Sequence, residues 1–368
     1  MLISLIGILV TLLLIIGIHE FGHFLMARLL GIKVLRFSIG FGKALWKRSD
    51  KTGTEYVIAA IPLGGYVKML DIQEGEVAEN EQHLAFNHQP FYKKCLVVIA
   101  GPLSNFILAF ILYWILFMTG FTSVRPVTGN IIPHSIAARA GLPSNVEIMK
   151  VDNTPVTSWM GVMIRLLSRT GDTGLLTMEV KPLNKPTTKT YSLDLTDWQM
   201  DHLKPDPLDS LGIEPYEPTV LPPLKLKWPD ALLRKNQYGP IEALSHAWQN
   251  VNNFTLLNLI IIGKLFTGKV SLQSLGGPIS IFQTAGIALN NGITPFLSFL
   301  AFLSISIGMI NVLPIPGLDG GHLLFQAIEA IMRRPISPKI IGLCYRIGFI
   351  LLFLLIFQTM INDVLRLR

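Results

Sequence analysis

Long apolar stretches alternate with polar segments along the chain, and four of the stretches are long enough to cross a bilayer. They run over Leu2 to Ile18, Cys95 to Gly120, Ile293 to about Pro314, and about Ile341 to Ile361. Each is close to the roughly 20 residues that a spanning helix needs. The first run lacks the basic start and the cleavage site of a signal peptide, so we expect its helix to be retained and to continue through His23. The pattern predicts a polytopic α-helical membrane protein.

The loops between these runs differ in their number of basic residues, and this difference predicts which side of the membrane each loop faces. The stretch from Arg28 to Lys94 holds ten lysines and arginines, and the connection between the third and fourth runs holds Arg333, Arg334 and Lys339. Lys and Arg accumulate in cytoplasmic loops. We therefore expect both loops in the cytoplasm and both termini outside, because the opposing basic residues at the C-terminus are outnumbered.

The segment between the second and third runs is then extracytoplasmic, and its pattern changes along its length. Residues 121–200 show short β-type runs around a helical pattern at Ser158 to Leu167, which predicts a small β-rich domain. A Pro-rich linker is expected over 201–240, and an amphipathic segment that caps a cavity or lies at the membrane interface over 241–292. Residues 1–120 and 293–368 carry the predicted transmembrane helices in pairs.

One β-type run lies on the cytoplasmic side, in residues 53–69. Tyr56 to Ile61 reads as a strand, Pro62 to Gly65 as a turn, and Tyr66 to Met69 as a return strand. The run is as apolar as membrane-exposed sequence, although non-helical backbone is tolerated at membrane depth only where protein or water satisfies its polar groups. We therefore expect a membrane-reentrant β-hairpin beside a cavity.

Composition and charge agree with this picture and exclude other classes. Half of the 368 residues are hydrophobic and only 15% are charged, which is too apolar for an ordinary soluble enzyme. The net charge of +7 comes without a basic stripe interleaved with aromatic residues, so we expect no nucleic-acid partner. Cys95 and Cys344 each begin an apolar run and do not indicate a disulfide framework.

The residues His19, Glu20 and His23 form an HExxH motif at the end of the first apolar helix. Positions four apart share a helical face, so both imidazoles can reach one metal ion. The glutamate between them is not a ligand and can act as the base that takes a proton from water at the metal. A polar helix end at the membrane interface is the alternative, although such residues are costly to hold in an apolar helix.

A catalytic zinc site uses three protein ligands and keeps one open position, so a third ligand must come from elsewhere. Asp319 is the best candidate, because it follows the third apolar run where Pro314 and Pro316 break the helix. A helix cap at the membrane surface is the alternative for this aspartate. His322 is a weaker candidate ligand, with a supporting or packing role as its alternative.

These motifs together resemble the site-2 protease family of intramembrane zinc metalloproteases. The resemblance rests on HEFGH in the first helix and on Asn-x-x-Pro-x-x-x-x-Asp-Gly from Asn311 to Gly320. Gly101 to Asn105, Gly64 to Met69 and Gly277 to Ser280 are similar to the bacterial branch of regulator-of-sigma-E proteases. The resemblance implies His19, His23 and Asp319 as Zn²⁺ ligands and Glu20 as the catalytic base.

The resemblance also implies the other parts of the protein and its substrates. It implies that 121–200 is a PDZ-like domain, one where this branch usually has two, and that the protein sits in a bacterial inner membrane. The domain is then periplasmic, and the active site faces the cytoplasmic side. The implied substrates are single-span membrane proteins of the anti-sigma factor type, cut in regulated intramembrane proteolysis during envelope stress, with signal-peptide remnants as a second class.

Substrate contacts are expected from five residues. The hairpin, with Gly64, Gly65 and Tyr66, offers an edge to which an unwound substrate strand can add. Asn311 can hold the substrate backbone through side-chain hydrogen bonds, or else satisfy carbonyls that Pro314 frees. Asn105 can also hold the substrate backbone, and helix–helix hydrogen bonding is the alternative for its side chain.

Two other functions remain open at this point. An inactive relative would bind membrane helices without cutting them, but both motifs are intact here. A transporter could use the intramembrane His, Glu and Asp as an ion path, although transporters tend to show repeated halves and this chain shows no internal repeat.

Overall fold

The computed structural model describes residues 2–72, 77–183, 185–200, 206–216, 219–221, 225–227 and 229–366. Contacts divide the chain into two compact units, which are described separately. The first comprises Met1–Trp114 and Pro278–Phe357, and the second comprises Ile115–Gly277 and Gln358–Arg368. The predicted linker residues 201–205, 217–218, 222–224 and 228 lie outside the described residues.

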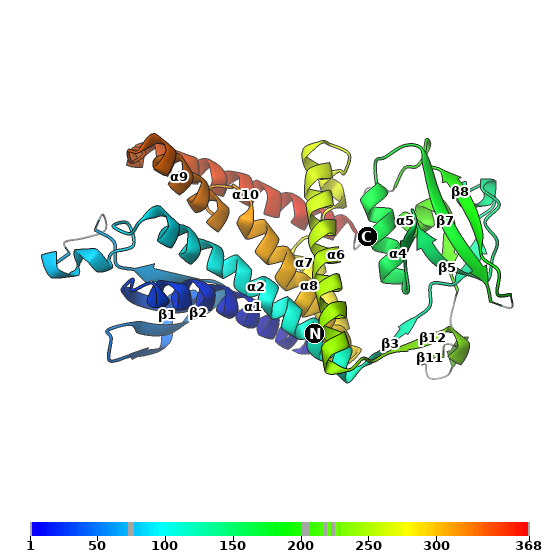
Figure 1. Ribbon diagram of the computed structural model, residues 1–368, viewed down its shortest axis with the longest axis horizontal. Helices are drawn as coiled ribbons and strands as arrows, with labels where there is room; N and C mark the ends of the chain where they lie inside the picture. Colours follow the sequence, from blue (N-terminus) through cyan, green and yellow to red (C-terminus); the bar gives the residue numbers. More distant parts are fainter. Residues whose placement is uncertain are drawn as a thin grey trace. The chain divides into compact units, whose positions relative to one another are not determined.

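The four predicted spanning segments are helices. They are α1 (Leu2–Leu29), α2 (Phe91–Thr119), α8 (Ile293–Val312) and α10 (Pro338–Arg366) (Figure 1). Among the described residues these four are long and apolar enough to cross a membrane, with α1 meeting the criterion over Gly7–Leu29. The prediction of four membrane-length helices is therefore confirmed, with boundaries shifted by a few residues.

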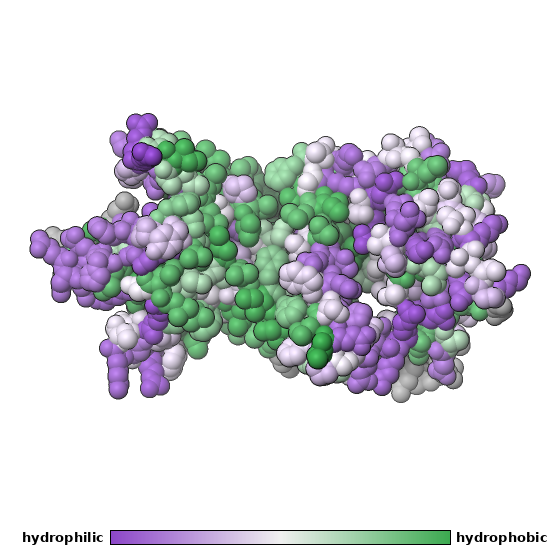
Figure 2. Space-filling model, in the orientation of Figure 1, coloured by the Kyte–Doolittle hydropathy of each residue, from purple (hydrophilic) through white to green (hydrophobic). Residues whose placement is uncertain are grey.

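The surface of the first unit supports the same conclusion. Apolar side chains on α10 are widely exposed, and Phe349, for example, is 70% exposed. Figure 2 shows this as hydrophobic surface over the helices, with hydrophilic residues beyond them. Exposed apolar surface of this extent needs a lipid or protein partner.

The β-structure of the first unit differs from the predicted hairpin. Strand β1 (Val34–Ser49) pairs with β2 (Glu55–Met69), and the register splits each of them in two. Residues 34–39 pair antiparallel with 65–69 and also align, in the same chain direction, with 55–58; residues 44–49 pair with 55–59. The prediction that 56–61 pairs with 66–69 was wrong, because 34–39 lies between these two segments.

The sheet is bent and packs on α1 through one face. Gly40 and Gly42 separate the halves of β1 with φ values of 95° and 85°, a conformation that glycine adopts without strain. Phe37 and Val67 pack on the cluster around Phe24 of α1. This packing sets the second half of β2 beside the HExxH segment.

Shorter elements complete the first unit. Helix α7 (Pro278–Asn290) packs against α1 and α8, and α9 (Asp319–Met332) comes after the break at the end of α8. A short 3₁₀ helix, η1, covers Glu79–Leu84. Helix α7 falls within the segment expected to be amphipathic.

The second unit contains the β-rich domain. Its largest sheet has the order β6-β5-β7-β8. These strands are β5 (Val146–Val151), β6 (Thr154–Pro155), β7 (Leu175–Pro182) and β8 (Lys189–Asp194). Helix α4 (Trp159–Arg169) packs its Leu166 into the core with Ile148 and Met178, all 0% exposed. Helix α3 (Ile136–Arg139) and strand β4 (Thr128–Ile131) precede the sheet.

This core extends beyond the expected boundary at residue 200. Asp206 caps α5 (Pro207–Leu211) by accepting hydrogen bonds from two backbone amides, and β9 (Ile213–Pro215) pairs with β4. Leu208, Leu211 and Ile213 belong to the same core as α4. Residues 207–215 are therefore part of the β-rich domain, and the linker can begin only after residue 215.

The remaining elements of the second unit are short pairs of strands and one long helix. Strand β3 (Phe121–Val124) pairs with β12 (Leu233–Asn236), and β10 (Thr219–Leu221) pairs with β11 (Lys225–Lys227). The 3₁₀ helices η2 (Asp230–Leu232) and η3 (Leu272–Ser274) lie in its connections.

Helix α6 (Pro240–Phe266) covers the first part of the segment 241–292 that was expected to be amphipathic. It buries Ala243, Ala247 and Val251 while Ile241 and Phe266 are exposed. Asp172, in the loop after α4, forms ion pairs with Lys264 (3.3 Å) at the end of α6 and with Lys269 (2.9 Å). The end of α6 is thus joined to the β-rich domain.

Candidate metal centre

The HExxH residues lie in the C-terminal half of α1, in the helix predicted as the first span. Because α1 is helical through Leu29, His19 and His23 fall one turn apart on the same face. Their Nε2 atoms are 3.3 Å apart. The helix alone therefore presents two imidazole nitrogens to a single point.

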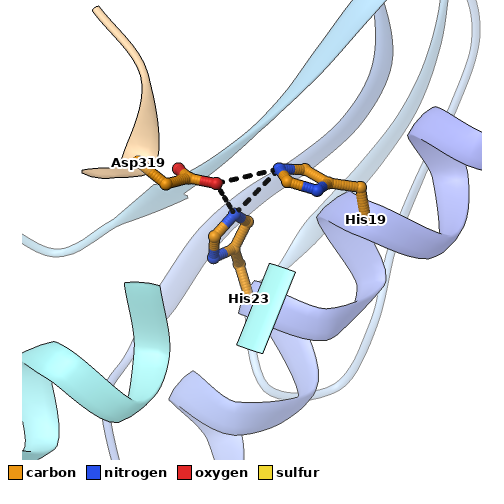
Figure 3. Close-up of side chains that lie close together, drawn as sticks. All are labelled: His19, His23 and Asp319. Carbon is orange, nitrogen blue, oxygen red and sulfur yellow. Dashed lines mark hydrogen bonds and ion pairs between the residues drawn. The ribbon is translucent and has the colours of Figure 1, made fainter. Parts of the chain in front are cut away.

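Asp319 reaches this point from a segment almost 300 residues away in the sequence. The chain turns sharply between α8 and α9, and a Cβ on Gly320 would lie 2.2 Å from the Leu313 carbonyl oxygen. This turn starts α9 at Asp319, whose Oδ2 lies 3.1 Å from His19 Nε2 and 3.4 Å from His23 Nε2 (Figure 3). The predicted convergence of the three residues is thus present in the structure.

The arrangement fits a metal ion. The three ligand atoms lie within 4.8 Å of one another, and the side chains of His19, His23 and Asp319 are only 12%, 10% and 19% exposed. Asp319 Oδ2 is buried and receives no hydrogen bond of standard geometry from the described residues. Two imidazoles and a carboxylate also match the donor types of catalytic zinc sites.

The electrostatics of Asp319 favour its charged form. Burial alone would raise the pKa of this carboxyl, but the attraction of the two imidazoles lowers its pKa below the usual range. A carboxylate that stays ionised at neutral pH is ready to bind a cation without first losing a proton.

Glu20 lies beside this cluster and faces the sheet. Its carboxyl interacts electrostatically with both imidazoles and with Asp319. A Cβ on Gly65 would lie 2.7 Å from Glu20 Cγ and 2.8 Å from the Ser38 carbonyl oxygen. Gly65 is therefore needed for clearance, since any side chain there would displace Glu20 or the strand.

Helix α2 supports both histidines from one stripe of its surface. His23 Nδ1 lies 2.8 Å from the Val97 carbonyl oxygen, and Asn105 Nδ2 lies 3.3 Å from His19 Nδ1. Between them, a Cβ on Gly101 would lie 2.2 Å from His23 Nε2. Val97, Gly101 and Asn105 are spaced four apart, so they share the helix face that meets α1.

Gly22 permits the close approach of these two helices. A Cβ at this position would lie 2.3 Å from both the Ala100 carbonyl oxygen and Ser104 Oγ. The sequence motifs assigned no role to Gly101, Gly22 or Val97. A four-residue spacing from Asn105 was visible in the sequence, but the helix it faces was not.

The other predicted contact residues lie in different surroundings. The Asn311 side chain has no hydrogen-bond partner among the described residues, so it does not satisfy the carbonyls near Pro314. The Tyr66 phenol accepts a hydrogen bond from Arg36 (3.2 Å) and its ring stacks on Phe41. Gly64 gives room to the same ring of Phe41.

His322 lies outside the cluster of ligand atoms. It hydrogen-bonds to the Tyr345 hydroxyl, with 3.0 Å between Nδ1 and the oxygen. Burial lowers its pKa, so the ring is neutral at pH 7. The described contacts therefore agree with a supporting or packing role.

Comparison with known proteins identifies the family. The sequence pattern of peptidase family M50 matches residues 7–355. The chain belongs to peptidase family M50. It is 37% identical to Protease RseP of Yersinia pestis over 99% of both chains. It is also 37% identical to Regulator of sigma-E protease RseP of Escherichia coli K12, over 98% of this chain and 97% of the relative.

A third relative is more distant but covers the chain as fully. It is the Putative zinc metalloprotease of Vibrio cholerae, 33% identical over 98% of both chains. Because the family and these relatives extend over nearly the whole sequence, this M50 peptidase is a metalloprotease of the site-2 type, as the sequence motifs predicted.

Proposed function

We propose that this M50 peptidase cuts peptide bonds within membrane segments, with His19, His23 and Asp319 holding one zinc ion and Glu20 as the general base. The observation that carries the proposal is the convergence of both Nε2 atoms on Asp319 Oδ2, at 3.1 and 3.4 Å. Zinc, when bound, supplies Lewis acidity for the scissile carbonyl and acidifies water.

The protein's own residues perform the proton transfers. Glu20 takes a proton from the attacking water and passes it to the leaving amine, a role that requires a carboxylate beside the ligands rather than among them. Val97 fixes the His23 ring through Nδ1, which leaves Nε2 for the metal. The low exposure of the three ligands keeps bulk water away and strengthens these interactions.

The substrate segment adds to the sheet as a strand. Residues 65–69 pair with 34–39 on one side, and no described strand pairs with their other side. A strand with a free edge binds an extended peptide through backbone hydrogen bonds, and Gly65 next to Glu20 brings that peptide to the base. Asn311, whose amide has no described partner, holds the substrate backbone, and Tyr66 and Gly64 maintain the shape of the strand.

The substrate must leave the helical state before it can bind in this way. Helical peptide groups are tied into hydrogen bonds within the segment, so segments with helix-breaking residues are cut preferentially. The substrates are single-span membrane proteins of the anti-sigma factor type, a class that agrees with the name of the Escherichia coli relative as a regulator of sigma-E. Remnant signal peptides form a second class.

The protein lies in a bacterial inner membrane with both termini in the periplasm. The basic loops support an orientation with the catalytic end of α1 towards the cytoplasm. In this orientation the β-rich domain of 121–215, a single PDZ-like domain, is periplasmic. The alignment to the Yersinia relative spans 446 positions against 368 residues in this chain. The alignment is therefore at least 78 positions longer than the part of this chain that it covers. A difference of this size is within the range of one small domain, which supports a single PDZ-like domain here.

The proposal is tested with two matched peptides in detergent. One transmembrane peptide carries a central helix-breaking residue and the other carries leucine there, and products are identified by mass spectrometry. We expect cleavage of the first peptide, suppressed by a chelator, and much slower cleavage of the second. Equal rates would contradict the unwinding requirement. No cleavage of either peptide together with zinc flux across liposomes would instead support a transporter.

A further inference from the structure

We propose that Asn105 is the positioning residue of His19, accepting a hydrogen bond from its Nδ1–H through the amide oxygen. This assignment replaces a substrate contact as the main role of Asn105, and it rests on the proposed zinc site. The two imidazoles of the site are then both oriented by α2, one by a backbone carbonyl and one by a side-chain amide.

The side-chain oxygen of Asn105 is buried without a hydrogen-bond donor among the described residues. Asn105 is 0% exposed, yet its Oδ1 has no hydrogen-bond partner among the described residues. Its Nδ2 lies 3.3 Å from His19 Nδ1. A buried carbonyl oxygen without a donor costs about 1–3 kcal/mol, so this arrangement of the amide is unfavourable.

The chemistry of a metal ligand gives this amide a definite orientation. His19 directs Nε2 at Asp319 and His23, so Nε2 is the atom that binds the metal. A neutral imidazole bound through Nε2 carries its hydrogen on Nδ1, which is then a donor. An amide N–H₂ facing this donor would be repelled. A half-turn of the amide exchanges its two ends, brings Oδ1 to Nδ1, and supplies the donor that Oδ1 lacks.

The backbone of Asn105 is held so that only the amide can turn. Ser304 Oγ on α8 donates a hydrogen bond of 2.8 Å to the Asn105 carbonyl oxygen. A Cβ on Gly308, one turn further along α8, would lie 3.3 Å from Asn105 Cβ. Because Cβ is fixed between α1 and α8, packing sets the distance from the amide to His19. The rotation of the amide then decides whether its oxygen, an acceptor, or its nitrogen, a donor, faces His19 Nδ1.

The other histidine of the site, His23, has a hydrogen-bond acceptor of this kind at its Nδ1. Its Nδ1 faces the Val97 carbonyl oxygen at 2.8 Å, which can only accept. Such partners of ligating histidines fix the tautomer and the orientation of the ring, and their removal typically weakens metal affinity by about 10–100-fold. Asn105 supplies the same support two turns further along α2.

The test compares zinc binding in three variants of the full chain, with a chelating dye as competitor. Asn105→Leu keeps the approximate size and removes the acceptor, so we expect zinc affinity to fall by about 10–100-fold. Asn105→Asp keeps an acceptor in either rotation, so zinc affinity should match or exceed that of the parent. Ser304→Ala removes the neighbouring hydrogen bond to the Asn105 backbone and should change zinc affinity by less than about threefold, because the acceptor of His19 is retained.

The order of affinities separates the possible roles. If the amide donated to His19, Asn105→Asp would bind zinc more weakly than Asn105→Leu, which would overturn the proposal. Equal zinc affinity in the parent and Asn105→Leu would also overturn it, as would a loss in Ser304→Ala equal to that in Asn105→Leu. Thermal unfolding of the zinc-free variants identifies any variant that has failed to fold. If Asn105→Leu fails to fold, the zinc affinity of Asn105→Asp relative to that of the parent decides the test.

Failure of this inference is distinguishable from failure of the proposed function. A parent protein that binds no zinc would contradict the metal centre itself. A parent with about one zinc per chain, as three ligands at one point predict, and with no effect of the Asn105 variants would contradict only the role of Asn105.

Discussion

The most specific structural requirement of the metal centre is the absence of a side chain at Gly101. In Gly101→Ala, the new Cβ would lie 2.2 Å from His23 Nε2 and 2.4 Å from Cε1. Since such contacts do not occur below 3.0 Å, Nε2 must move by at least 0.8 Å, the difference between 3.0 and 2.2 Å. Zinc–nitrogen bonds are about 2.0–2.1 Å long and tolerate about 0.2 Å, and the hydrogen bond from Nδ1 to Val97 resists the movement. His23 would then be lost as a ligand of the proposed site.

We expect Gly101→Ala to weaken zinc binding by at least about 100-fold, which corresponds to about 2.7 kcal/mol, and to abolish cleavage at limiting zinc. Zinc affinity is measured by dye competition, and cleavage with the helix-breaking peptide. The matched control is Gly342→Ala, also in a long apolar helix, where a new Cβ meets nothing within 4 Å. Zinc affinity of Gly101→Ala equal to that of the control would refute the reasoning.

Three further predictions concern other parts of the molecule. Gly65→Ala should slow cleavage about 10–100-fold while zinc stays bound, because the new Cβ displaces Glu20 and not a ligand; zinc loss would argue against this. Leu166→Ala should destabilise the β-rich domain by about 2–5 kcal/mol in denaturant unfolding, without changing the zinc content. Burial opposes the ionisation of Asp172, but its two lysine partners lower its pKa. These ion pairs therefore stabilise the fold when the pH is above about 3.9, the pKa of an aspartate in the unfolded chain. The lower stability of Asp172→Asn at pH 7 should therefore disappear as the pH falls below about 4, and a difference that persists at lower pH would contradict the pairing.

The helical parts of the fold were predictable because lipid imposes a simple rule. A spanning helix must satisfy its backbone internally and expose apolar side chains, so its length and composition appear directly in the sequence. Even the Pro-broken connection before Asp319 was visible, since proline cannot continue a helix. This is why the convergence of His19, His23 and Asp319 could be predicted from two distant motifs.

The sheet was only half predictable. Residues 36–42 alternate Arg, Phe, Ser, Ile, Gly, Phe and Gly, which is a period-two signal for a strand. Arg36 counted only as one of the basic residues of a loop. The insertion of 34–39 between 55–58 and 65–69 depends on how the sheet packs on α1. No local pattern contains that information.

The supporting residues of the metal centre show the same limit. Gly101 is an ordinary small residue in an apolar helix until His23 of α1 is known to lie against it. The end of the β-rich domain was also missed, because Pro207 and Pro215 resemble a linker although Leu211 and Ile213 between them enter the core. Proline content alone does not distinguish a linker from a capped turn.

The assignment of base and ligands is tested most directly by counting zinc and measuring cleavage in the same preparations of the parent, Glu20→Gln and Asp319→Ala. We expect about one zinc per chain in the parent and in Glu20→Gln, and a clear deficit in Asp319→Ala after dialysis against a weak chelator. Only the parent should cut the helix-breaking peptide at full rate, with Glu20→Gln slower by at least about 100-fold. Cleavage by Glu20→Gln at the parental rate, or full zinc retention in Asp319→Ala, would contradict the assignment.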